Sequence, residues 1–295
     1  MKVGYPCINR SIGCTANSTF RLANYSEENL IKKVENNINC LEKILNFNIE
    51  NNLLFFRISS DIIPFASHPI CKFNWRKHFR KRFGEIGKLI KENEIRISMH
   101  PDQFVLINSI KEEIVKKSIE ELRWHCNLLD LMKLDFSAKV QIHVGGLYGD
   151  KNSAIERFIE NFRKMPNLIK RRIVIENDEK FYSLKDCLYI SEILDIPVVF
   201  DSFHHECLNN KETVVEAIRR AESTWKEKDG LLMVDYSSQE PNSKKGKHAN
   251  HIDIAHFTEF IKSTKNFDFD IMLEIKDKEK SALEAIKILH RIEKI

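Results

Sequence analysis

Short apolar runs alternate with longer amphipathic segments along this chain. Eight of the apolar runs are rich in Ile, Val and Phe, a composition typical of parallel strands that are covered on both faces. They lie at 2–9, 53–59, 95–100, 139–145, 172–178, 197–203, 231–238 and 270–276. Apolar residues at helical spacing predict helices at 26–46, 111–134, 153–164, 183–194, 212–227, 252–263 and 280–293. Strands that alternate with helices in this way predict an α/β fold, a single (β/α)8 TIM barrel over residues 1–295. A doubly wound open sheet is the alternative, because the pattern alone does not show closure.

The composition is that of an ordinary globular protein, and the charge is only mildly basic. Of 295 residues 42% are hydrophobic, and 47 basic against 43 acidic side chains give a formal net charge of +4. This balance permits a nucleic-acid partner without demonstrating one. The seven cysteines are odd in number and include no C-x-x-C pair, so we expect reduced thiols and no thiolate zinc site. No stretch resembles a signal peptide or approaches the ~20 apolar residues of a membrane helix, so we expect a cytoplasmic protein that binds no membrane.

Metal-ligating residue types stand at or just beyond the ends of most predicted strands. They are His68, His100, His143, Glu176, Asp201, His204, Asp235, His248 and Glu274. Because the strand ends of a (β/α)8 barrel converge on one mouth, we expect these side chains to share a small volume. Each alone has an ordinary interpretation, such as a helix cap for Asp201. Their joint occurrence favours one metal centre at the mouth of the barrel over a series of independent accidents.

The chemistry of this residue set also favours metal. Buried carboxylates and imidazoles crowded together repel one another unless cations compensate them. Ligation by nitrogen and oxygen without sulfur points to Mn, Zn or Fe(II). Nine candidate ligands exceed the needs of one ion, so we expect two or three. Clustered ions of this kind typically act on a phosphate, where they activate water and stabilise the leaving oxygen.

Several longer motifs resemble those of the UV damage endonuclease family, and together they cover essentially the whole chain. They are GYPCIN, RISSDIIPFASH, SMHPDQFV, IHVGG with GDK, IENDE, FDSFHH, SSQ followed by GKHA, and MLEIKDKE. The resemblance implies a (β/α)8 enzyme that nicks DNA immediately 5′ of pyrimidine photoproducts, and often at abasic sites, leaving a 3′-hydroxyl and a 5′-phosphate. It also implies a cluster of divalent ions, Mn²⁺ first, with Zn²⁺, Mg²⁺ or Co²⁺ as alternatives.

The resemblance assigns roles to the strand-end residues. The implied ligands are His68, His100, His143, Glu176, Asp201, His204, His248 and Glu274, and we expect Glu176, Glu274 and His143 to be catalytic. The seventh strand departs from the family pattern of Lys-x-His, because this chain has Met233, Val234 and Asp235 there. Asp235 can replace a histidine as a ligand of a hard cation, whereas Met233 cannot bind one. One metal position is therefore altered in this chain.

The same resemblance implies residues that contact damaged double-stranded DNA. In the family a Gln followed by an aromatic residue, usually Tyr, probes the duplex after the third strand, and this chain has Gln103 and Phe104 there. An amide can hydrogen-bond an orphaned base while the ring stacks in place of a displaced lesion. Tyr5 and Asn9 also match family positions near the lesion. Basic residues near the mouth are candidates for phosphate contacts, namely Lys151, Lys244, Lys245 and Lys247.

Other functions remain open at this stage. An abasic-site endonuclease of a related metal-barrel type and a metal-dependent sugar isomerase or epimerase use similar ligands. The third hypothesis is a damage-binding protein without catalytic activity, which the departure from the family pattern at Met233 and Asp235 suggests. For the endonuclease we expect a monomer, associated with the nucleoid when it acts.

Overall fold

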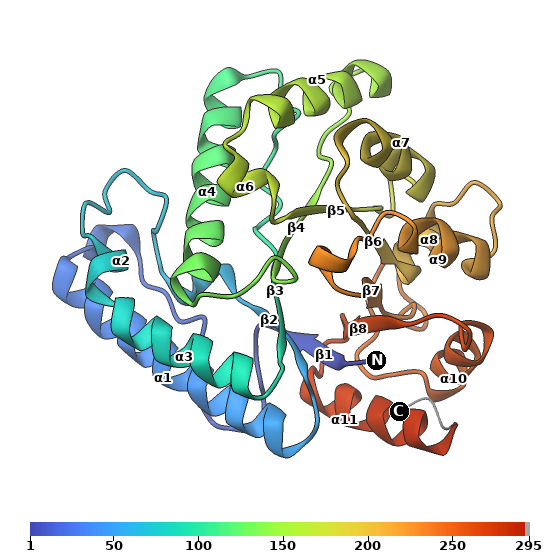
Figure 1. Ribbon diagram of the computed structural model, residues 1–295, viewed down its shortest axis with the longest axis horizontal. Coiled ribbons are helices and arrows are strands. Elements are labelled where there is room, and N and C mark those ends of the chain that lie inside the picture. Colours follow the sequence, from blue (N-terminus) through green and yellow to red (C-terminus); the bar gives the residue numbers. More distant parts are fainter. Residues whose placement is uncertain (293–295) are drawn as a thin grey trace.

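The computed structural model describes residues 1–292, in which eight parallel strands close into a barrel surrounded by helices (Figure 1). Each strand pairs with the next along the chain, and β8 pairs with β1. The strands are β1 Val3–Pro6, β2 Phe55–Ile58, β3 Arg96–Met99, β4 Lys139–His143, β5 Ile173–Glu176, β6 Val198–Asp201, β7 Leu232–Tyr236 and β8 Phe269–Leu273. This closed order confirms the predicted TIM barrel and excludes the open sheet.

Helices connect the strands, and their apolar faces cover the outside of the barrel. The longer ones are α1 Glu27–Glu50, α3 Arg80–Glu92, α4 Glu112–Leu131, α5 Lys151–Lys164, α7 Leu184–Leu194, α9 Val214–Glu222, α10 Ile254–Ser263 and α11 Glu279–Arg291. Ser26 caps the start of α1, because its side chain accepts a hydrogen bond from the backbone N–H of Asn29. Among the described residues no helix is both long and apolar enough to cross a membrane.

The segment between β2 and β3 reads as a basic run in the sequence, yet it folds into helices. These are α2 Trp75–His78 and α3, and the buried positions of α3 include Phe83, Ile86 and Ile90. Lysines and arginines occupy the outer positions of this segment and mask its amphipathic pattern. The eighth barrel helix is therefore present, although the hydrophobic pattern did not single it out.

Inside the barrel, an apolar layer lies beneath the polar mouth. Five buried side chains from five strands form a cluster of their own: Phe55, Val174, Val199, Met233 and Met272. Successive side chains of a strand point to opposite sides, so residues two positions apart share a face. The residues two positions further along these strands are Arg57, Glu176, Asp201, Asp235 and Glu274. Met233 therefore serves packing, and the layer above it carries four carboxylates.

The expectation of reduced thiols is wrong for one pair. Cys14, in the loop after β1, forms a disulfide with Cys40 of α1, across 26 residues of sequence. The other five cysteines are free. Folding places a loop cysteine against a helix, and cysteine spacing alone does not predict such a contact.

Candidate metal centre at the mouth of the barrel

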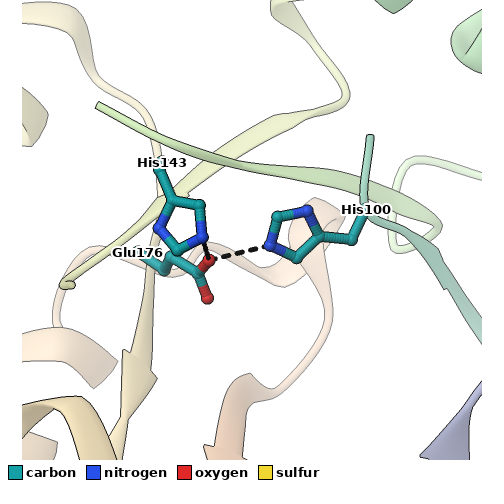
Figure 2. A group of neighbouring side chains, drawn as sticks. All are labelled: His100, His143 and Glu176. Carbon is teal, nitrogen blue, oxygen red and sulfur yellow. Dashed lines mark hydrogen bonds and ion pairs between the residues drawn. The ribbon is translucent and has the colours of Figure 1, made fainter. Parts of the chain in front are cut away.

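Glu176 is the centre of the histidine and carboxylate cluster. It ends β5 and is 1% exposed. Its Oε1 lies 2.8 Å from Nε2 of His100 and 2.9 Å from Nε2 of His143. Figure 2 shows both imidazole rings directed at the same carboxylate oxygen. The register of β4 and β5 pairs His143 with Glu176, and His100 follows β3, so three neighbouring strands deliver this group.

The three groups shift one another's pKa. Burial raises the pKa of Glu176, but the two imidazoles outweigh it and hold that pKa well below its usual range. Burial lowers the pKa of His143, but the Glu176 carboxylate outweighs it and raises the pKa to about 9. One ligand atom from each of the three residues lies within 4.8 Å of the others. Two imidazole nitrogens and a carboxylate oxygen at this spacing suit a divalent ion.

A second carboxylate group lies beside the first, where β6 and β7 end. Glu176, Asp201 and Asp235 each have an oxygen within 4.8 Å of the others, and all three are buried. Burial raises the pKa of Asp201 to about 7 against the lowering effect of His204. Burial likewise raises the pKa of Asp235 to about 7, against the lowering effect of Arg57. Burial is the main cause of both raised pKa values, because it removes the two carboxyl groups from water.

His204 and His248 extend the site along the mouth. Asp201 Oδ1 accepts a hydrogen bond from the backbone N–H of His204 at 2.7 Å, and Asp201 Oδ2 lies 3.1 Å from His204 Nδ1. His248 Nδ1 lies 2.9 Å from the backbone oxygen of Glu274. Ring centroids are 5.2 Å apart for His100 and His143, 6.1 Å for His143 and His204, and 5.8 Å for His204 and His248. The four imidazoles thus form a continuous row.

Arg57 is part of this centre and was not predicted. It is 3% exposed, and its guanidinium pairs with both Asp235 and Glu274. Gln141 accepts from Arg57 at 3.0 Å and donates its amide N–H to Glu176 and Asp235. An arginine inside a run as apolar as LLFFRIS is the sequence signal that could have revealed it.

Two adjoining cavities open above the cluster. The first, of about 440 Å³, is lined by residues that include His100, His143, His204 and Glu274. The second, of about 680 Å³, is lined by residues that include Lys276 and Lys278, which sequence reasoning also missed. His100, Gln103 and Glu274 border both cavities, so the two cavities adjoin. The imidazoles of the first therefore lie near Lys276 and Lys278 of the second.

The chain matches the model of the UV-endonuclease UvdE family over residues 1–295. It is 43% identical over its whole length to a UV DNA damage endonuclease of Clostridium perfringens, of which it covers 72%. The chain belongs to the UvdE family. A Bacillus mycoides UV DNA damage endonuclease is 37% identical over 88% of this chain and 83% of its own length.

Solved structures agree with this UvdE assignment. The crystal structure of SacUVDE superposes with a TM-score of 0.95 at 48% identity and complete coverage of both chains. Endonuclease IV of Thermus thermophilus has a TM-score of 0.58 at 12% identity, over 86% of this chain and 94% of its own. A D-psicose 3-epimerase of Clostridium cellulolyticum has a TM-score of 0.57 at 13% identity, over 85% of this chain and 93% of its own. The last two likenesses show the barrel fold alone.

Most expected ligands of this UvdE-family chain come together, but His68 does not. It is exposed in the loop after β2, where its Nδ1 accepts a hydrogen bond from the backbone N–H of Ile70 and its ring lies against Phe65. It lines a separate cavity with Trp75 and Trp124. The placement differs from the expectation because His68 lies ten residues beyond the end of β2, where the loop rather than the barrel decides its position.

The expected DNA contacts divide into exposed and buried residues. Gln103 is exposed and Phe104 is 75% exposed, both at the rim of the second cavity. Tyr5 and Asn9, in contrast, are 0% and 1% exposed. Asn9 donates to the Tyr5 hydroxyl at 2.8 Å, which donates to Asn48 of α1 at 2.6 Å. In this arrangement both side chains support the loop after β1 and are not exposed, and their expected contact with DNA stays a prediction.

The expected basic residues divide in the same way. Lys244, Lys245 and Lys247 are exposed in the loop between β7 and α10. Lys151, at the start of α5, pairs with Asp186 at 2.8 Å and lies over the ring of Tyr182. Its charge is thus already engaged within the protein, whereas the loop lysines are available to an anionic partner.

Proposed function

We propose that this UvdE-family DNA-repair endonuclease nicks duplex DNA immediately 5′ of UV photoproducts, and also at abasic sites, by metal-dependent hydrolysis. The products are a 3′-hydroxyl and a 5′-phosphate. The observation that carries the proposal is the convergence of His100 and His143 on one oxygen of Glu176, beside two adjoining cavities. His100 and the exposed Gln103 line both cavities, and Phe104 lies at the rim of the second.

The residues present fit a divalent cluster. Imidazole nitrogens and carboxylate oxygens suit ions such as Mn²⁺, and one ligand atom each of His100, His143 and Glu176 lies within 4.8 Å of the others. The proposed ligands are His100, His143, Glu176, Asp201, His204, His248 and Glu274. When bound, such ions polarise a phosphate and lower the pKa of water. His68 and Asp235 are not included, because His68 lines a separate cavity and Asp235 is paired with Arg57.

The chain's own residues bind and orient the substrate. Gln103 and Phe104 insert at the lesion, where stacking is already weakened, so helix deformability supplies selectivity. Lys276 and Lys278, with the exposed loop lysines, hold the DNA backbone through charge. Gly145 lines the first cavity with a φ of +116°, and a Cβ there would lie 2.3 Å from Asn108 Oδ1. Its lack of a side chain lets the backbone turn close to the cavity.

A nicking assay tests this proposal. A labelled duplex with one thymine dimer is incubated with Mn²⁺, Mg²⁺, Zn²⁺ or chelator, beside undamaged and abasic duplexes. We expect dimer-dependent cleavage that chelator and Glu176→Gln abolish. Glu160→Gln, an exposed substitution on α5, is the matched control and retains activity. Cleavage of the abasic duplex alone identifies an abasic-site endonuclease instead, and metal-loaded protein that is silent on every duplex contradicts the proposal.

A further inference from the structure

The polar layer above the apolar cluster carries one fixed cation among its carboxylates. Arg57 lies two residues beyond Phe55, so the strand period turns it inward beside Glu176, Asp201, Asp235 and Glu274. Guanidinium stays protonated at any pH the protein meets. One permanent positive charge is therefore built into the layer from which metal ligands are drawn.

Arg57 contacts both oxygens of Asp235 through one nitrogen, Nη2. Arg57 Nη2 lies 2.9 Å from Asp235 Oδ1 and 2.8 Å from Oδ2, and Nη1 donates to Oε1 of Glu274. Asp235 is 0% exposed. The contact is charge-assisted, and such contacts are roughly twice as strong as hydrogen bonds between neutral groups.

Gln141 closes the remaining space between Asp235 and Glu176. Its Oε1 accepts from Arg57, which fixes the orientation of the amide. Its NH₂ group then donates to Glu176 Oε2 and Asp235 Oδ2. Asp235 Oδ2 thus accepts two hydrogen bonds, as many as its lone pairs allow. Oxygens of Glu176, Asp201 and Asp235 are near enough for one ion, but the guanidinium already contacts both oxygens of Asp235 and the amide also donates to Oδ2.

We propose that Arg57 is a built-in cation of this centre and that Asp235 is its counterion, not a metal ligand. The inference rests on the metal centre of the proposed function. Divalent ions would then be confined to the outer residues, with Glu274 among those that would hold them. Arg57 acts as a positioning residue: it holds Glu274 by one oxygen and, through Gln141, holds the inner oxygen of Glu176.

Metal content separates the two roles of the acids. Wild type, Asp235→Asn and Asp201→Asn are loaded with Mn²⁺, passed through gel filtration and analysed for manganese per chain, and Mn²⁺ affinity is measured by calorimetry. Asp235→Asn should keep the wild-type number of ions per chain, whereas Asp201→Asn should lose an ion or bind it at least roughly tenfold more weakly. Loss of an ion in Asp235→Asn would overturn the assignment.

A second arm uses no metal and so is independent of the proposed function. In chelator, the melting temperatures of Arg57→Met, Asp235→Asn and the double variant are compared, because residues in one ion pair couple non-additively. The melting temperature of the double variant should be no lower than that of Arg57→Met. In Arg57→Met the Asp235 carboxylate is buried without its cation, and Asp235→Asn removes that unpaired charge. Additive losses would overturn the pairing. Wild type that binds no Mn²⁺ but shows this coupling would reject the proposed metal centre while leaving Arg57 as the cation that balances Asp235.

Discussion

Truncating Phe104 should separate lesion binding from stability. The ring is 75% exposed, so folding removes only about a quarter of its surface from water. Full burial of a Phe side chain contributes ~1.5–3 kcal/mol, so Phe104→Ala should lower the free energy of unfolding by less than about 1 kcal/mol. Stacking of a base on an aromatic ring contributes ~1–3 kcal/mol, which corresponds to roughly 5- to 150-fold in affinity. The loss should therefore fall almost entirely on DNA binding.

Fluorescence anisotropy in chelator and at fixed salt measures this loss without cleavage. Phe104→Ala should weaken binding to a duplex with one thymine dimer by that factor and change binding to undamaged duplex little. Phe104→Trp should retain affinity, because its ring still stacks. Tyr189→Ala is the matched control, since Tyr189 is 54% exposed on α7 and lines neither mouth cavity.

Equal affinity of wild type and Phe104→Ala for the damaged duplex would refute the role of the ring. A similar loss on damaged and undamaged duplex would also contradict it, because it would indicate a general contact and not a response to the lesion.

Three further outcomes are expected. Glu176→Gln should weaken Mn²⁺ binding at least roughly tenfold in calorimetry, because it removes the charge on which two imidazoles converge; unchanged binding would exclude Glu176 as a ligand. Burial lowers the pKa of His143 but Glu176 raises it to about 9, so near neutral pH the metal-free ring is protonated. Metal binding needs the neutral ring, so it should release protons, and the apparent Mn²⁺ affinity should rise with pH toward about 9. Calorimetry in buffers of different ionisation enthalpy measures the proton release, and its absence would contradict this expectation. Denatured, unreduced protein should titrate five thiols and reduced protein seven, if the bond between Cys14 and Cys40 is closed.

The sequence was most informative where the order of apolar and polar residues along the chain is enough to predict the structure. Apolar runs and strand ends predicted the closed barrel, and they placed Glu176, Asp201 and Asp235 together, because parallel strands bring their carboxyl ends to one mouth. The histidines directly at or near strand ends, His100 and His143, followed from the same rule.

Residues whose place depends on loops or on packing escaped prediction. His68 is too far from its strand for the barrel to position it, and Tyr5 is turned inward by its hydrogen bond to a residue of α1. Arg57 was missed because a strand covered on both faces shows no alternation that would reveal which side chains enter the barrel. The strand period places Arg57 on the same side as Phe55, but only the structure shows that this side faces the inside of the barrel, where Arg57 meets Asp235.

The position and chemistry of the cut test the central claim most directly. A duplex labelled on the strand with one thymine dimer is treated with metal-stripped protein, before and after Mn²⁺ is restored, and the fragment is sized and offered to a DNA polymerase. The account predicts a single Mn²⁺-dependent break at the phosphate immediately 5′ of the dimer, with a 3′-hydroxyl that the polymerase extends. A break elsewhere, an end that is not extended, or equal cleavage in chelator would contradict it.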